Sequence, residues 1–145
     1  MLTNEKILIE LEKMLKTALK KNDSPVAALI VYNNKIISKA YNKRNKSNKT
    51  TDHAEIIAIN KANRKLNSWR LNKCTLYTTL EPCEMCASVI KESRISEVCY
   101  ILERNPDKKQ YNKTNFKNLS KKNDEFQKFA KNYKKIMKNF WENKR

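Results

Sequence analysis

The sequence predicts an α/β domain. Segments in which apolar residues recur with the 3.6-residue period of an amphipathic helix alternate with short apolar, β-branched runs that are typical of strands. The chain has 145 residues, 39% of them hydrophobic, which is enough for one domain with a buried core. We therefore expect a single domain over residues 1–145, with neither an internal repeat nor a second domain.

A helix and a β-hairpin are expected first. Apolar residues share one face of a predicted helix over residues 4–21, which indicates core packing rather than membrane binding. Residues 26–32 and 35–41 form two predicted strands, because both runs are apolar and β-branched. Asn33 and Asn34 join these strands, and Asn tolerates the positive φ angles of a tight hairpin turn.

The middle of the chain predicts two helices that alternate with strands. Thr51 or Asp52 can cap a helix that begins at His53. After this helix we expect a strand, a second helix and a strand, over residues 74–79, 83–92 and 97–102. Each of the two helices follows a loop, so His53 and Cys83 stand where helices begin.

The last third of the chain predicts a loop and then a long helix. Residues 103–123 have weak periodicity and many Lys and Asn, so we expect a loop there. From Asp124 onward, apolar and aromatic residues recur at helical spacing and predict one long C-terminal helix. This stripe consists of Phe126, Phe129, Ala130, Tyr133, Ile136, Met137, Phe140 and Trp141.

The single histidine of the chain belongs to a candidate metal site. His53 is followed two residues later by Glu55, and Cys83 and Cys86 lie in the run Pro-Cys-Glu-Met-Cys. A catalytic zinc ion takes three protein ligands and one water molecule, and one His with two Cys supplies those three ligands. On a helix that opens after Pro82, both sulfur atoms share one face. We therefore expect these three side chains to bind Zn²⁺ and Glu55 to move a proton beside the metal. His-x-Glu followed by Pro-Cys-x-x-Cys is the pattern of zinc nucleobase deaminases.

A structural zinc knuckle and a thioredoxin-like dithiol are the competing interpretations of the cysteines. A knuckle requires a fourth protein ligand, for which Cys74 and Cys99 are candidates. Both lie in β-rich runs, so we expect them to be small buried hydrophobes. The polar start of the chain and the lack of a membrane-length apolar run lead us to expect reduced thiols, a cytoplasmic location and no membrane partner.

The chain is strongly basic, with a formal net charge of +17. Clustered Lys and Arg attract phosphates, which indicates a nucleic-acid partner. Residues 104–145 carry 14 basic and 4 acidic side chains, so the charge is concentrated at the C-terminal end. A compositional bias competes with this interpretation, since 26 of the 32 basic residues are Lys and Gly is absent, as in proteins from AT-rich genomes.

Longer motifs resemble those of the bacterial tRNA adenosine deaminase (TadA) family within the cytidine deaminase-like superfamily. The resemblance covers about residues 25–98, and its strongest stretches are residues 52–56, 75–87, 93–95 and, at the aromatic C-terminus, 137–141. It implies a three-layer α/β/α fold with a five-stranded mixed sheet and a homodimer with one zinc ion per subunit. The implied reaction is hydrolysis of adenosine to inosine at the wobble position of a tRNA anticodon loop.

The resemblance also implies roles for individual residues. It assigns Zn²⁺ to His53, Cys83 and Cys86 and the proton transfer to Glu55, as the spacing does. Asn42 matches the Asn that hydrogen-bonds the flipped base, although in an Asn-rich chain an ordinary turn residue is the competing interpretation.

Three more side chains are candidates for binding the substrate. Lys43 and Arg44 follow Asn42 and can meet phosphates. At the C-terminus we expect Phe140 to lie in the core and Trp141 to be the RNA neighbour.

Two departures from the family pattern concern the backbone. Ala27 replaces a Gly, so its φ angle must be negative or strained. Residues 101–106 replace the family's Gly-containing loop, which carries an acidic contact to the RNA. Glu103, Arg104 and Asp107 are equally arguable equivalents of that contact residue, so none of them is assigned.

Two alternative functions remain open at this stage. A deaminase of a free base or nucleoside, such as cytosine, guanine or cytidine, uses the same zinc chemistry, but it has no need for a polycationic end. A non-catalytic, zinc-stabilised RNA-binding module has no need for an acid or base at Glu55.

Overall fold

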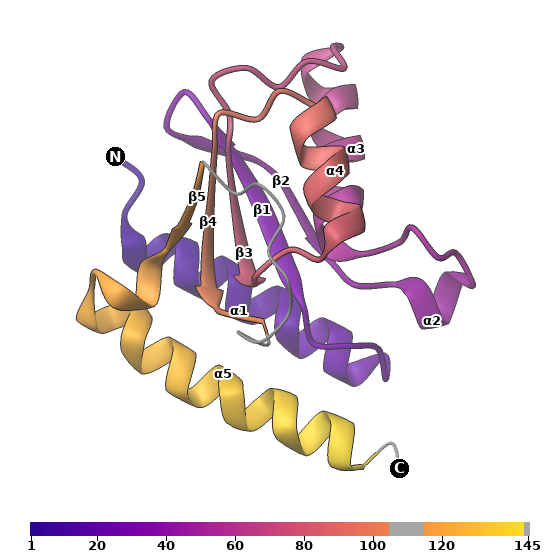
Figure 1. The fold of residues 1–145 in the computed structure, drawn as a ribbon, viewed down its shortest axis with the longest axis vertical. Helices are drawn as coiled ribbons and strands as arrows, with labels where there is room; N and C mark the ends of the chain where they lie inside the picture. Colours follow the sequence, from indigo (N-terminus) through magenta and orange to yellow (C-terminus); the bar gives the residue numbers. More distant parts are fainter. Residues whose placement is uncertain (105–114, 144–145) are drawn as a thin grey trace.

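A five-stranded mixed sheet lies between two layers of helices in the computed structural model, which describes residues 1–104 and 115–143 (Figure 1). The strand order is β2-β1-β3-β4-β5. Strand β1 pairs antiparallel with β2 and β3, whereas β3, β4 and β5 run parallel. The strands are β1 (Ala27–Tyr32), β2 (Lys35–Tyr41), β3 (Thr75–Leu80), β4 (Glu97–Leu102) and β5 (Phe116–Asn118).

Two pairs of helices cover the two faces of the sheet (Figure 1). Helices α1 (Asn4–Lys20) and α5 (Asp124–Glu142) lie on one face, where they contact each other and the sheet. Helices α3 (Ala54–Leu66) and α4 (Glu84–Glu92) lie together on the other face. This arrangement confirms the expected α/β/α layers and the long C-terminal helix.

The β1–β2 hairpin turns where the sequence predicts. Asn33 and Asn34 have φ angles of 50° and 63°, so both occupy the left-handed region that a two-residue hairpin turn requires. Asn also takes a left-handed conformation at Asn22, Asn48 and Asn67, each of which follows a helix. Ala27 is not among the described residues with positive φ, so the replaced Gly causes no left-handed strain.

Helix α5 is held to the sheet by a buried tyrosine as well as by its apolar stripe. Phe126, Tyr133 and Phe140 are its buried residues. The Tyr133 hydroxyl donates to the carbonyl oxygen of Pro25 at 2.7 Å and lies 3.1 Å from the Thr79 hydroxyl. The hydroxyl group of Tyr133 is therefore hydrogen-bonded although it is buried. Its bonds connect α5 to the residues before β1 and to β3.

Two local predictions were wrong, and one short helix was not predicted. Neither Thr51 nor Asp52 caps α3, because His53 itself is the N-cap residue, with extended φ and ψ and no side-chain capping bond. The sequence also carried no indication of the four-residue helix α2 (Arg44–Ser47), which is too short to show a hydrophobic period.

The other wrong prediction is the loop expected over residues 103–123. Residues 116–118 form β5, and a 3₁₀ helix follows at Leu119–Lys121. Strand β5 is recognisable only through its parallel pairing with β4, where Phe116 lies opposite Val98, since three residues cannot establish an alternating pattern. The part of the predicted loop at residues 105–114 lies outside the described residues.

The buried apolar residues of the helices pack within the fold. In the parts of the chain that the structure describes, no helix combines the length and the apolar character needed to cross a membrane.

Candidate metal and catalytic site

Two helix N-termini bring the three predicted ligands together. His53 is the N-cap residue of α3, and Cys83 is the N-cap residue of α4, with Cys86 one turn further along α4. Helices α3 and α4 pack against each other, so their first turns lie side by side (Figure 1). The positive ends of the helix dipoles favour thiolate over thiol at such positions.

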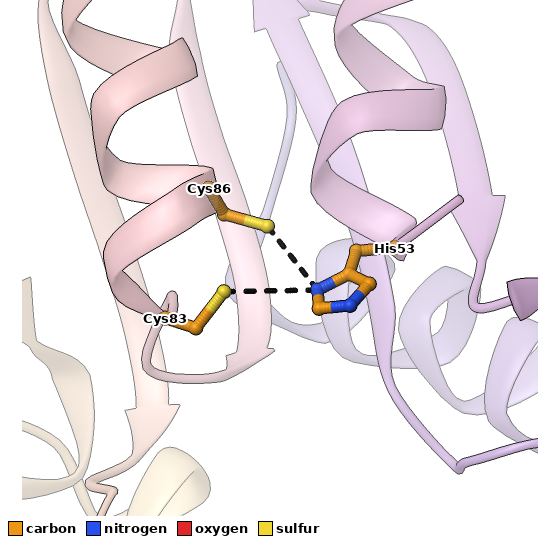
Figure 2. Close-up of side chains that lie close together, drawn as sticks. All are labelled: His53, Cys83 and Cys86. Carbon is orange, nitrogen blue, oxygen red and sulfur yellow. Dashed lines mark hydrogen bonds between the residues drawn. The ribbon is translucent and has the colours of Figure 1, made fainter. Parts of the chain in front are cut away.

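The spacing of the three donor atoms fits a tetrahedral metal centre. The Nδ1 atom of His53 lies 3.7 Å from the Sγ atom of Cys83 and 3.4 Å from that of Cys86, and both sulfur atoms point toward the imidazole (Figure 2). All three donor atoms lie within 4.8 Å of one another. Metal bonds of zinc length imply donor separations of about 3.5 to 3.8 Å in a tetrahedron. Among the described residues, this is the one group of three or more His, Cys, Asp or Glu side chains arranged to hold a metal ion.

The two remaining cysteines are not part of this group. Cys74 and Cys99 are almost fully buried, as predicted, and burial raises the pKa of both thiols, that of Cys99 to about 12. Neither contributes a fourth ligand, so the fourth position of the centre is not taken by a cysteine.

The two candidate ligand cysteines shift each other's pKa in opposite directions. The hydrogen bond from Cys86 lowers the pKa of Cys83 most, and His53 lowers it further. The same hydrogen bond raises the pKa of Cys86, and burial and Glu55 add to that increase. These shifts favour the thiolate at Cys83, and a metal that binds both sulfur atoms also displaces the proton of Cys86.

Glu55 lies in the first turn of α3 beside this group. Its side chain is 1% exposed, and neither carboxylate oxygen has a hydrogen-bond partner among the described residues. Burial raises the pKa of Glu55, and the nearby Cys83 adds to this shift. A buried carboxyl group with a raised pKa and no protein partner suits proton transfer to and from a small molecule held beside the metal ligands.

The loop that follows β2 runs beside the start of α3. Asn42 is buried, and its backbone N–H donates to the carbonyl oxygen of Val26. The backbone N–H of Lys43 donates to the carbonyl oxygen of Asp52 at 2.9 Å, which ties Lys43 to the residue before His53. The structure thus brings Asn42 and Lys43 to the edge of the candidate site.

The charged side chains of this loop lie further out. The Lys43 ammonium lies 4.9 Å from the centre of the Tyr41 ring, in cation–π geometry. Arg44 is exposed and is the first residue of α2. Both can therefore be reached by a partner that approaches along this side.

The two aromatic residues at the end of α5 differ in exposure, as expected. Phe140 is 8% exposed, whereas Trp141 is 47% exposed and meets the Phe140 ring edge-on with ring centres 5.2 Å apart. The helix that carries Trp141 lies across the sheet from α3 and α4 (Figure 1). No described contact joins Trp141 to the metal-ligand group, so the structure does not bring these two predicted parts of the site together.

Two residues at the site had no assigned role in the sequence. The Arg104 backbone N–H donates to Oε1 of Glu81 at 3.0 Å, and its Nε donates to the Glu81 carbonyl oxygen at 2.7 Å. The Glu81 backbone N–H in turn donates to the carbonyl oxygen of Leu102. These bonds fix the connection from β3 to Cys83. Glu81 could have been suspected from its position in Glu-Pro-Cys, but nothing in the sequence distinguished Arg104 from Glu103.

The sequence of the chain is similar to those of known deaminases. The model of the MafB19-like deaminases matches residues 3–145. The chain is 39% identical over 100 residues to the tRNA-specific adenosine deaminase of Bacillus subtilis (strain 168). The aligned region covers 69% of this chain but only 62% of that relative. It is 38% identical over 128 residues to the tRNA-specific adenosine deaminase of Buchnera aphidicola subsp. Schizaphis graminum (strain Sg), with coverage of 83% and 82%.

Solved structures share the fold. One is a tRNA:A34 deaminase studied for A-to-I editing at the wobble position of transfer RNA, with a TM-score of 0.66, 32% identity, and coverage of 70% of this chain and 79% of that chain. The guanine deaminase from Bacillus subtilis has the same TM-score of 0.66, with 34% identity and coverage of 70% and 66%. The expected cytidine deaminase-like fold is therefore confirmed.

Proposed function

The chain belongs to the MafB19-like deaminase family, and from that premise we propose that it is a zinc-dependent tRNA adenosine deaminase that forms inosine at the wobble position of an anticodon loop. The observation that carries the chemistry is the buried carboxyl group of Glu55, which has no hydrogen-bond partner among the described residues and lies beside the donor atoms of His53, Cys83 and Cys86. The substrate class follows from the tRNA-specific relatives and from the charge of +17.

Zinc is the metal that the donor set fits best. Two sulfur atoms and one imidazole nitrogen at tetrahedral spacing suit Zn²⁺, whereas Mg²⁺ and Ca²⁺ require oxygen ligands. We propose that His53, Cys83 and Cys86 hold one Zn²⁺ per subunit. When bound there, zinc supplies Lewis-acid activation of a water molecule.

Glu55 is the proposed proton carrier. Deamination consumes one water molecule, adds its oxygen to C6 of adenine and releases the amine as ammonia. The carboxylate of Glu55 accepts one proton from the attacking water and passes it to the ring of the base as the C6–O bond forms. It then carries the second proton of that water to the amine, which leaves as ammonia as the C6–N bond breaks. The raised pKa of Glu55 brings its two protonation states closer in energy, as both halves of this transfer require.

Substrate binding is assigned to the loop after β2 and to the C-terminal helix. Asn42 is proposed to hydrogen-bond the flipped base, and Lys43 and Arg44 to contact phosphates next to it. The exposed ring of Trp141 is proposed to stack on RNA further away. A homodimer, which the resemblance to tRNA adenosine deaminases implies, and the cytoplasmic location expected from the sequence complete the proposal.

Deamination of a free base is the second candidate function. The equal structural similarity to a guanine deaminase favours it, because both families use the same fold. The concentration of positive charge after residue 103 favours RNA, since a small neutral base gains nothing from a polycationic surface.

One assay separates the two functions. Zinc-loaded protein is incubated with total tRNA, and anticodon loops are sequenced for A-to-I conversion, while guanine, adenosine, cytosine and cytidine are tested in parallel for ammonia release. We expect conversion of a wobble adenosine and no rapid turnover of the free compounds. Rapid turnover of a free base with unchanged tRNA would instead identify a small-molecule deaminase.

A further inference from the structure

A buried carboxyl group lies behind Asn42. Asp23 belongs to the connection between α1 and β1 and is 1% exposed. Its Oδ1 accepts a hydrogen bond from the Asn42 side chain at 2.7 Å and another from the backbone N–H of Ser24 at 3.0 Å. Its Oδ2 accepts from the backbone N–H of Lys46, in α2, at 3.2 Å. One side chain thus joins the connection between α1 and β1 to the segment that follows β2.

These bonds fix which way the Asn42 amide faces. A carboxylate accepts hydrogen bonds and donates none, so the atom of Asn42 that meets Asp23 has to be Nδ2 and not Oδ1. The amide orientation, which is otherwise ambiguous, is therefore set by the chemistry of Asp23. The bond uses one Nδ2 hydrogen and leaves the second one and Oδ1 for the base.

Asp23 is itself held in place by the backbone. The N–H groups of Ser24 and Lys46 bind different oxygens of the carboxylate, so the group cannot rotate without losing one of them. Because these donors are backbone groups and Asp23 is buried, its position is defined before any substrate arrives. A side chain fixed in this way can in turn hold Asn42 in one orientation.

We propose that Asp23 is a positioning residue for the substrate, and that it acts by orienting the Asn42 amide toward the flipped base. This inference rests on the proposed function, since it needs Asn42 to contact the base. The hydrogen bonds described for Asp23 lead to Ser24, Asn42 and Lys46 and not to His53, Cys83 or Cys86, so its proposed effect reaches the reaction through Asn42. Asp23 acts as a hydrogen-bond acceptor, and a side chain that only donates could not hold the Nδ2 group of Asn42.

The experiment is a double-mutant cycle between Asp23 and Asn42, with kcat and KM for tRNA as readouts. Asp23→Ala removes the acceptor, and misplacement of a base contact lowers kcat/KM by about 10²-fold. Asp23→Asn keeps one neutral oxygen for Asn42, although its NH₂ group cannot accept the bond from Lys46. Because a neutral hydrogen bond has roughly half the strength of a charged one, the loss stays below about tenfold. In the Asn42→Ala background, both substitutions are expected to change kcat/KM by less than about twofold, because pairs that act as a unit are not additive.

Controls separate orientation from folding. Glu10→Ala removes another buried carboxyl group, one that pairs with lysines on α1 and β2, and it should leave kcat/KM unchanged. Zinc content and melting temperature are measured for every variant, and Asp23→Asn alone decides the cycle if Asp23→Ala does not fold. In NMR spectra of metal-loaded protein, the Asn42 side-chain N–H facing Asp23 should be protected from exchange in the wild type and unprotected in Asp23→Ala.

The outcomes distinguish this inference from the proposed function. Equal losses of kcat/KM from the Asp23 substitutions with and without Asn42 would show that Asp23 is merely structural and would overturn the inference alone. A zinc-loaded wild type that converts no adenosine in tRNA overturns the proposed function, and the substrate role of Asp23 falls with it. Non-additive losses, with zinc content and fold intact, support both.

Discussion

The Nδ1 atom of His53 and the Sγ atom of Cys86 lie 3.4 Å apart, although 33 positions separate the two residues in the chain. This proximity follows from the packing of α3 against α4, which sets the first turns of the two helices side by side. The fold therefore holds the ligands close to binding geometry, which lowers the reorganisation needed when a metal binds.

Removal of a ligand thiol should empty the metal site. Cys83→Ala and Cys86→Ala each remove one of three protein ligands, so we expect zinc content well below one per subunit and loss of deamination. Zinc is measured by mass spectrometry of dialysed protein. Cys99→Ala is the matched control, because this thiol is buried in β4 and is not in the ligand group, so zinc should be retained. Full zinc occupancy in both ligand variants would contradict the proposed centre.

Replacement of Glu55 should separate binding from chemistry. Glu55→Gln preserves the shape of the side chain but cannot carry the proton, so turnover should fall by about 10²- to 10⁴-fold with zinc and tRNA binding intact. Single-turnover deamination and filter binding measure the two properties. Glu84→Gln, at an exposed position of the first turn of α4, is the control and should leave turnover unchanged. Near-normal turnover of Glu55→Gln would exclude Glu55 as the proton carrier.

The lysines of α5 should contribute to tRNA affinity by binding phosphates. Replacement of Lys134, Lys135 and Lys138 with Gln should weaken binding and flatten the log-log salt dependence by about 0.7 for each single-strand phosphate that is no longer neutralised. Affinity is measured over a range of salt concentrations, with zinc content as a check.

The control for the α5 lysines carries the same change of charge elsewhere. Lys35 is the first residue of β2, Lys65 lies in the last turn of α3, and Lys73 precedes β3. The metal-ligand group lies instead at the start of α3 and after the end of β3. Replacement of these three lysines with Gln should change the salt slope less. An equal effect of both triple variants would mean that the attraction comes from net charge and not from a particular surface.

The two neighbouring aromatic residues of α5 should have different effects. Phe140→Ala removes a buried ring and should lower the free energy of unfolding by about 3 to 5 kcal/mol. Trp141→Ala removes a half-exposed ring, and if that ring stacks on RNA, the loss appears as about 1 to 3 kcal/mol of binding free energy. Denaturant unfolding and tRNA affinity are measured for both variants. A Trp141→Ala variant that loses stability and keeps full affinity would make Trp141 a packing residue.

Acid should destabilise the protein partly through Glu10. Its hydrogen bond with Lys6 lowers its pKa most, and Lys39 lowers it further, to below the unfolded value of 4.5. A carboxyl group with a lowered folded-state pKa stabilises the fold above its unfolded pKa, and that contribution is lost as the pH falls through the folded-state pKa. Glu10→Gln should therefore be less stable than wild type at pH 6, and the difference should shrink below about pH 4. Urea unfolding at both pH values checks this, and a difference that stays constant would contradict it.

The metal-ligand group could be predicted because its information is local. His53 with Glu55, and Cys83 with Cys86, form two short motifs, and each sits where a predicted helix begins. Helix periodicity and the Asn hairpin turn predicted most of the elements for the same reason. These patterns depend only on residues that are close together in the sequence, so they can be recognised without knowing which distant segments are in contact.

Asp23 and β5 could not be predicted because they depend on distant partners. Asp23 stands in an ordinary polar turn, and only the folded chain places Asn42 and Lys46 against its carboxylate. Strand β5 has only three residues and exists through its pairing with β4. The cap of α3 was mispredicted because Thr51 and Asp52 are good capping residues in isolation, whereas His53, the proposed metal ligand, occupies the capping position.

The left-handed turns of this chain are made without glycine. Five of the seven described residues with positive φ are Asn, and the sequence contains no Gly. Asn samples fewer backbone conformations than Gly does in the unfolded state, so less conformational entropy is lost when each turn forms. The Asn-rich composition is therefore more than a bias of the genome at these positions: the protein folds from a stiffer unfolded ensemble than a chain with glycine turns would have.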